Sequence, residues 1–256
     1  VIRTILTLLF KVTDEGIRIL ETEINLVQGK GSGGDTPELE VKYLSTLILS
    51  DGDLVVFDVG AHVGDYGQAV LKHFPDAKLV CFEPNSSSYS VLESRFKNDS
   101  QVKVEKIAFS NSRGEGSLYF DIDGSPLASL VKRDLSFIGI TNLRNEIVTF
   151  DTIDSYCEAN KVIPTILKLD VEGHELTTLE EAKKSLPKIA VVQFEFGGAN
   201  KDSRTFFYDF YNLFRDSKFD LYRISPSKLV KIPHYSEFDE HFRTTNFVAT
   251  NSQLVR

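Results

Sequence analysis

Short apolar runs alternate with helical patterns along most of the chain. The runs are rich in β-branched residues and bounded by turn-forming residues, which is typical of buried strands. We expect strands at Leu54–Phe57, Lys78–Phe82, Val102–Ala108, Thr165–Leu169 and Ile189–Phe194, and helices at Pro37–Ser50, Tyr66–Phe74, Ser87–Phe96, Thr152–Ala159 and Glu175–Leu186. Strands that alternate with helices predict βαβ units and an α/β fold with a mostly parallel, doubly wound sheet.

The pattern changes in two places. Gly114–Asp121 and Glu146–Phe150 look like extra strands, and we expect them to form an insertion on the sheet. After Glu195 the pattern predicts a further helix, two strands and a short meander, namely Ser203–Arg215, then Phe219–Ile224 and Thr245–Ala249, with the meander around Leu229–Ile232. Ser203 is a suitable N-cap for this helix. Such an ending suits two final strands paired antiparallel.

The first 36 residues lie outside this pattern. Residues 1 to about 28 have the spacing of one or two amphipathic helices, and their apolar start is interrupted by Arg3, is too short to span a bilayer and precedes no cleavage site. The glycine-rich segment Gly29–Gly34 lacks the preceding strand and the Lys-Ser/Thr pair that a Walker-type phosphate loop needs. We therefore expect residues 1–36 to be a helical extension with a glycine-rich linker, and residues 37–256 to be one main domain.

Composition narrows the class of protein. Hydrophobic residues make up 41% and charged residues 26% of the 256, which favours a globular protein that we expect to be cytoplasmic. The net charge of −8 and the absence of a dense basic run argue against a nucleic-acid partner. Cys81 and Cys157 lie far apart without a metal-type pairing, so we expect them to be free and buried.

The strongest motif is the segment Leu54–Gly64, in which a buried strand ends at Asp58 and turns through Gly60 and Gly64 into a helix. Glycines let the backbone pass close to a ligand, and open α/β sheets bind ligands beyond the carboxyl ends of their strands. A dinucleotide site requires G-x-G-x-x-G, whereas here Ala61 follows Gly60. An acidic Asp58 would repel a pyrophosphate but would favour a cationic amine, such as that of S-adenosylmethionine.

Two further motifs place acidic residues at strand ends. Leu79–Asn85 ends a strand at Glu83, where a carboxylate can accept hydrogen bonds from ribose hydroxyls. Ile166–Glu175 brings Asp170 and Glu172 to the same edge of the sheet. Carboxylates that gather there repel one another, so we expect a compensating cation, which is the sulfonium, a substrate amine or a divalent metal.

These motifs together resemble the FkbM-type methyltransferases, through Phe57–Gly64, Phe82–Asn85 and Lys168–Glu175, and the likeness runs from about Glu38 to Glu195. The resemblance implies a Rossmann-like class I methyltransferase fold with seven strands in the order 3-2-1-4-5-7-6, the last one antiparallel. It also implies S-adenosylmethionine as cofactor and O-methylation, often of sugar or polyketide hydroxyls. By the same resemblance the cofactor residues are Asp58, Gly60, Ala61 and Gly64 at the methionine end, Glu83, Pro84 and Asn85 at the ribose and adenine edge, and Ala108 in the adenine pocket. His62 lies in the cofactor turn, where we expect it to orient ligand or backbone.

Transfer of a methyl group to an alcohol needs a base that removes the hydroxyl proton. The candidates near this edge of the sheet are Asp170, Glu172, His174, Glu175 and Glu195. A histidine has the most suitable ordinary pKa for this role, although His174 at a helix start can also point to solvent. Asp170, Glu172 and Glu195 could together bind Mg²⁺, but their spacing does not require a metal.

Two alternatives remain at this point. A nucleotide-dependent oxidoreductase is disfavoured by the glycine spacing, and a catalytically silent binding module would keep the fold without turnover. The sequence leaves open which small-molecule or saccharide acceptor is used, and which oligomer forms.

Overall fold

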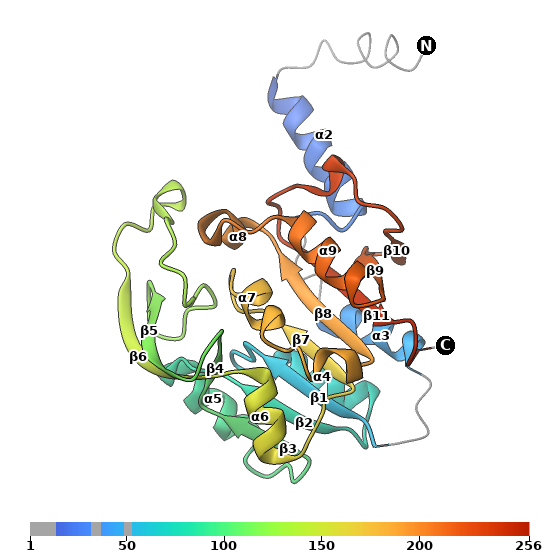
Figure 1. Cartoon of the computed structure of the whole chain (residues 1–256). Helices are drawn as coiled ribbons and strands as arrows, with labels where there is room; N and C mark the ends of the chain where they lie inside the picture. The colour runs from blue at the N-terminus through green and yellow to red at the C-terminus, as the bar shows by residue number, and fades with distance from the viewer. Residues whose placement is uncertain (1–13, 32–36, 49–52, 256) are drawn as a thin grey trace.

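The computed structural model describes residues 14–31, 37–48 and 53–255, and its centre is a twisted eight-stranded sheet (Figure 1). The strands lie in the order β10-β9-β11-β8-β7-β1-β2-β3. Their bounds are β1 Val55–Val59, β2 Lys78–Phe82, β3 Val102–Glu105, β7 Ile166–Leu169, β8 Val191–Phe196, β9 Phe219–Ile224, β10 Leu229–Lys231 and β11 Thr245–Asn251.

The strand order confirms the expected class I topology. Strands β3, β2, β1, β7 and β8 pair in parallel, and β11 pairs antiparallel with both β8 and β9. Without β10 the order is therefore 3-2-1-4-5-7-6. The expected number of seven strands was too small, because the meander after β9 forms β10, which pairs antiparallel with β9 from Leu229 opposite Ile224.

Helices cover both faces of this sheet, which explains why its central strands are almost continuously apolar. One face is covered by α3 (Pro37–Leu47), α4 (Asp65–His73) and α5 (Ser86–Phe96), and the other by α6 (Ile153–Asn160), α7 (Glu175–Glu180) and α9 (Phe207–Asp216). Neighbouring strand residues belong to opposite faces: Val56 packs with the α3 side and Phe57 with the α6 side. Both cysteines are free and buried, as expected.

The insertion forms a sheet of its own beside the main one (Figure 1). It contains β4 (Ala108–Phe109), β5 (Gly114–Phe120) and β6 (Arg144–Asp151), in the order β4-β6-β5. The single strand expected over Val102–Ala108 was therefore wrong. The chain leaves the main sheet after Glu105, and Ala108 pairs with Phe150 of the small sheet instead.

Two predicted helices differ from those observed. The helix expected over Glu175–Leu186 ends at Glu180. The helix expected over Ser203–Arg215 is divided into α8 (Gly198–Ser203) and α9, so Ser203 ends one helix and does not cap the next. The first backbone N–H groups of α9 are satisfied from a distance, because the Glu240 carboxylate accepts hydrogen bonds from the N–H groups of Phe207 (3.0 Å) and Tyr208 (2.8 Å).

The N-terminal part of the chain contributes α2 (Asp14–Val27), which projects from the body beside β9 and β10 (Figure 1). Of the helical extension expected over residues 1 to about 28, residues 1–13 lie outside the described residues, as do residues 32–36 of the linker. Within the ranges that the structure covers, no helix combines the length and apolar character needed to cross a membrane.

Candidate active site

An open cavity lies at the carboxyl ends of β1, β2 and β7. The turns after strands of the main sheet contribute predicted cofactor and catalytic residues to its wall, namely Gly60, His62, Glu83, Pro84, Asp170 and Glu172. The small sheet and its loop close the opposite side with Ala108, which was predicted for the adenine pocket, and with Leu118, Ser125, Pro126, Ala128, Ser129 and Leu130. The cavity therefore lies between the strand ends and the insertion.

Gly60 shapes the turn after β1. Its φ of +80° is left-handed, and a Cβ there would lie 1.9 Å from the carbonyl oxygen of Asp170. The N–H groups of Gly60 and Ala61 both donate to the carbonyl of Phe82, each at 3.0 Å, which fixes the turn against the end of β2. Ala61 is buried and does not line the cavity, and Gly64 forms the N-cap of α4 behind it.

Glu83 is a buried carboxylate in the cavity wall. It accepts hydrogen bonds from the backbone N–H groups of His62 and Asn85, each at 2.8 Å. Burial raises the pKa of Glu83, and the two backbone donors oppose that shift. Asn85 lies behind the wall, where its side chain caps α5 by accepting from the N–H groups of Ser87 and Ser88.

His62 links the turn after β1 to the insertion. Its Nε2 lies 2.9 Å from the carbonyl oxygen of Gly124. Because a carbonyl oxygen only accepts, Nε2 carries the proton in this contact. His62 therefore holds two walls of the cavity together, which agrees with an orienting role.

Asp58 has a different position from its neighbours. Its side chain is fully buried and does not line the cavity. The ammonium group of Lys168 lies 3.1 Å from the Asp58 carboxylate and 3.4 Å from that of Asp170, and it donates to the Gly60 carbonyl at 3.5 Å. The cation expected at this edge thus comes in part from the chain itself.

Lys168 belongs to a larger buried polar network on the α3 side of the sheet. Its ammonium group lies 5.0 Å from the centre of the Tyr66 ring, and the Tyr66 hydroxyl donates to the Gln193 side chain at 2.9 Å. Glu40 of α3 accepts from Gln193 at 2.5 Å and from Asn246 at 2.7 Å. Burial raises the pKa of Glu40 to about 7. This network connects α3 to the strands that carry the site.

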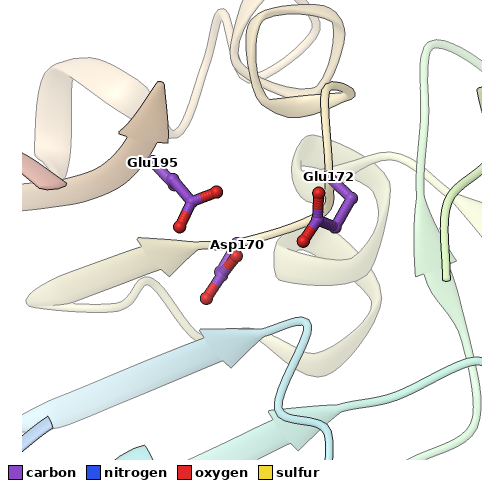
Figure 2. A group of neighbouring side chains, drawn as sticks. All are labelled: Asp170, Glu172 and Glu195. Carbon is purple, nitrogen blue, oxygen red and sulfur yellow. The ribbon is translucent and has the colours of Figure 1, made fainter. Parts of the chain in front are cut away.

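Asp170, Glu172 and Glu195 form a carboxylate cluster, with one oxygen atom of each within 4.8 Å of the others (Figure 2). Asp170 and Glu195 lie at the ends of β7 and β8, and Glu172 comes from the loop after β7. Arg133 of the insertion pairs with Glu172 and lies 3.7 Å from Asp202. Burial, and then the neighbouring carboxylates, raise the pKa of Glu195, and burial raises that of Glu172 to about 7.

The other two base candidates have partners elsewhere. His174 lies 3.0 Å from the Ser110 hydroxyl, and burial lowers its pKa. It is partly buried, so the alternative that it points to solvent does not hold. Glu175 accepts hydrogen bonds from the N–H groups of Val171 (2.9 Å) and Gly173 (3.0 Å), which fixes the loop between β7 and α7. Neither residue lines the cavity.

Comparison with known proteins assigns the chain to a family. The Methyltransferase FkbM domain matches residues 58–224, more than half of the chain. The chain belongs to this family. Hexuronic acid methyltransferase AglP of Haloferax volcanii is 26% identical to it over 156 residues, which are 60% of this chain and 61% of the relative. The match thus spans less than two thirds of that relative.

Solved structures with similar folds include another FkbM protein. Methyltransferase FkbM from Methylobacillus flagellatus KT has 15% identity and a TM-score of 0.46, covering 84% of this chain and 50% of that one. SMU.1697c of Streptococcus mutans, solved in complex with SAH, has 12% identity and a TM-score of 0.44, covering 84% and 98%.

The FkbM motifs contain one residue of the site that was not among the predicted site residues. Lys168 stands in the middle of an otherwise apolar strand pattern, and a lone charge in a buried strand is a signal for a paired internal group. Arg133 and Ser129 gave no such signal, because they lie in a loop of the insertion. Arg133 pairs with Glu172, and the Ser129 hydroxyl donates to the Glu172 carbonyl at 2.7 Å.

Proposed function

We propose that the chain is an S-adenosylmethionine-dependent methyltransferase that methylates a hydroxyl oxygen of a saccharide. The observation that carries this proposal is a single cavity whose wall joins the glycine turn and Glu83 to Asp170 and Glu172. Membership of the FkbM family supports methyl transfer. The relative that is named a hexuronic acid methyltransferase supports a saccharide acceptor.

The cavity wall fits the parts of this cofactor. The Glu83 carboxylate suits two ribose hydroxyls, since it accepts and does not donate. Ala108, Phe109 and Leu118 provide apolar surface for the adenine ring. When bound, the cofactor supplies a methyl group that its positively charged sulfur activates for in-line displacement. Asp58 would act through Lys168, which lies between it and the cavity edge, and not by touching the cofactor.

Asp170 is the carboxylate best placed to accept the proton of the acceptor hydroxyl. It lines the cavity, its side chain is 38% exposed, and Lys168 holds it at the end of β7. Glu172 is less exposed and is engaged by Arg133. Glu195 faces both from β8 (Figure 2). Positioning and proton removal by Asp170 are then what the protein adds to the chemistry of the cofactor.

The first experiment is calorimetric titration with S-adenosylhomocysteine, with NAD⁺ as the comparison. We expect micromolar binding of the former alone. Glu83→Gln should weaken this binding at least about tenfold. A carboxylate accepts hydrogen bonds through both oxygen atoms, whereas a glutamine amide accepts only through one. Glu93→Gln, at an exposed position of α5, is the matched control and should bind normally. Binding of NAD⁺ instead, or normal binding by Glu83→Gln, would contradict the site.

The second experiment is transfer of a labelled methyl group to a panel of monosaccharides and uronic acids, with product NMR to locate the methyl group on oxygen. Asp170→Asn should abolish transfer while leaving S-adenosylhomocysteine binding intact. Cofactor binding without transfer to any member of the panel would favour a binding module instead.

Metal dependence is tested in the same assay. Asp170 and Glu172 already have cationic partners in Lys168 and Arg133, so we propose proton removal without a metal. EDTA should leave the rate unchanged. Restoration by Mg²⁺ of a rate lost to EDTA would instead assign the carboxylate cluster as a Mg²⁺ site.

A further inference from the structure

A group of basic side chains gathers where the base of α2 meets the ends of β9 and β11. Lys30 follows α2, Arg223 lies on β9, and His241 and Arg243 precede β11. Three hydrogen bonds hold these segments together: Arg223 Nε to the Gln28 carbonyl (2.9 Å), Lys30 Nζ to the Phe238 carbonyl (3.1 Å) and Gly31 N–H to the Thr244 carbonyl (2.9 Å). Tertiary structure thus brings together charges that are far apart in the sequence.

Positive charge exceeds negative charge in this group. Among the described residues, Asp239 is the one carboxylate that forms an ion pair with it, at 4.0 Å from Arg223. The Arg223 side chain is only 12% exposed. Burial, followed by the charge of Arg223, lowers the pKa of Lys30, and burial also lowers the pKa of Arg223. Such a group of buried like charges costs free energy unless a negative charge compensates it.

His241 adds an unused hydrogen-bonding group. Both of its ring nitrogens are buried, and neither has a hydrogen-bond partner within the part of the chain that the structure describes. Burial, and then the charges of Lys30, Arg223 and Arg243, lower the pKa of His241 to about 4. A contact with the Arg243 backbone raises this pKa and so partly offsets the shift. The ring is therefore neutral at pH 7, with one N–H donor to offer.

We propose that Lys30, Arg223, Arg243 and His241 bind an oxyanion, a phosphate or carboxylate group carried by the methyl acceptor. An oxyanion supplies what this group lacks, namely negative charge for three cations and an acceptor for the imidazole N–H. The proposal rests on the proposed methyl transfer to a saccharide and narrows the acceptor to an anionic one. Lys30 belongs to the glycine-rich segment that lacks the features of a Walker-type phosphate loop. In the proposed site the anion is bound by side chains, namely Lys30, Arg223 on β9, and His241 and Arg243 before β11.

The position of this site relative to the carboxylate cluster suits one acceptor molecule. Asn246 of β11 pairs with Glu195 of β8, and Phe247 of the same strand pairs with Arg223 of β9. Asn246 and Phe247 are adjacent, so Glu195 and Arg223 point to opposite faces of the sheet, but each is next to the last residue of its strand at the same edge. Two strand spacings, roughly 10 Å, separate β8 from β9 along this edge. A sugar phosphate or a short acidic oligosaccharide that crosses the strand ends spans this distance, with its reacting hydroxyl at Asp170 and Glu195.

Binding of simple probes to the full chain tests the site without turnover. In the presence of S-adenosylhomocysteine, glucose 1-phosphate, glucuronate and glucose are titrated by NMR. We expect at least one anionic sugar to bind at least about tenfold more tightly than glucose, and more weakly as salt is raised. Preference for the phosphate or for the carboxylate identifies the anion. The double variant Lys30→Met/Arg243→Met should lose this preference, whereas Lys228→Met, an exposed lysine on the neighbouring turn, should keep it.

The His241 ring is a local reporter of the same event. Saturation with the anionic sugar should raise the pKa of His241, because the bound anion offsets the three cations. Equal binding of glucose, an unchanged double variant or an unmoved His241 would each overturn the proposal. Absence of anion binding while S-adenosylhomocysteine binds would leave the methyltransferase assignment intact, whereas failure of both would remove it.

Discussion

Replacing Lys168 by methionine would leave the Asp58 carboxylate buried without its partner. Asp58 is fully buried, and the Lys168 ammonium group lies 3.1 Å away with only 8% of its side chain exposed. Burial raises the pKa of Asp58, and Lys168 is the neighbour that opposes this shift. Within the described residues, no hydrogen bond to either Asp58 oxygen has good geometry, so the loss would fall on the carboxylate in full.

Removing one partner of a buried ion pair costs about 3–5 kcal/mol. A domain of this kind has roughly 5–15 kcal/mol of stability in total, so Lys168→Met should be folded but marginal. In the double variant Asp58→Asn/Lys168→Met the uncompensated charge is gone, and we expect at least ~2 kcal/mol to return.

Urea unfolding at pH 7, followed by circular dichroism, measures these changes. Lys78→Met is the matched control, because Lys78 forms a 3.0 Å ion pair with Asp53 at the surface, where both side chains are more than half exposed. The control should lose no more than ~1 kcal/mol. The double variant should also regain stability without regaining S-adenosylhomocysteine affinity, because Lys168 holds Asp170 and the Gly60 turn. A loss below ~1 kcal/mol for Lys168→Met would show that Lys168 does not compensate the buried Asp58 charge, and full recovery of affinity in the double variant would rule out the positioning role.

Two further predictions follow from backbone and burial. Gly60→Ala should destabilise the protein and abolish S-adenosylhomocysteine binding, because the new Cβ would clash with the Asp170 carbonyl. The control is Gly139→Ala, which has a similar φ of +85° but open space around it, and it should lower stability alone. Equal S-adenosylhomocysteine binding by the two variants would contradict the clash. Burial raises the pKa of Glu175 to about 8 from 4.5, so the folded state favours its neutral form; that stability is complete below about pH 4.5 and is lost as the pH rises towards 8. Urea unfolding from pH 5 to pH 8 should therefore show a smaller decline for Glu175→Gln than for the natural chain, and parallel curves would contradict it.

The architecture, and the edge of the sheet where the site lies, could be predicted from the sequence alone. Apolar runs separated by helical patterns indicate strands that are buried on both faces of a parallel sheet. This burial can be predicted because it appears in the local periodicity of the sequence. The glycine turn at Gly60 and the acidic residues Glu83 and Asp170 follow strand ends in the sequence. In a parallel sheet the carboxyl ends of those strands meet at one edge, so these residues were bound to come together there.

How the charges at that edge are balanced depends on tertiary contacts. The clustered carboxylates predicted an external cation, but two cations come from within the chain. Lys168 of β7 pairs with Asp58 of β1, and Arg133 of the insertion pairs with Glu172. The break between β3 and β4, and the capping of α9 by Glu240, likewise depend on distant segments. These features have the same cause. The local periodicity indicates whether a side chain is buried, whereas the residue that pairs with this side chain comes from a distant chain segment.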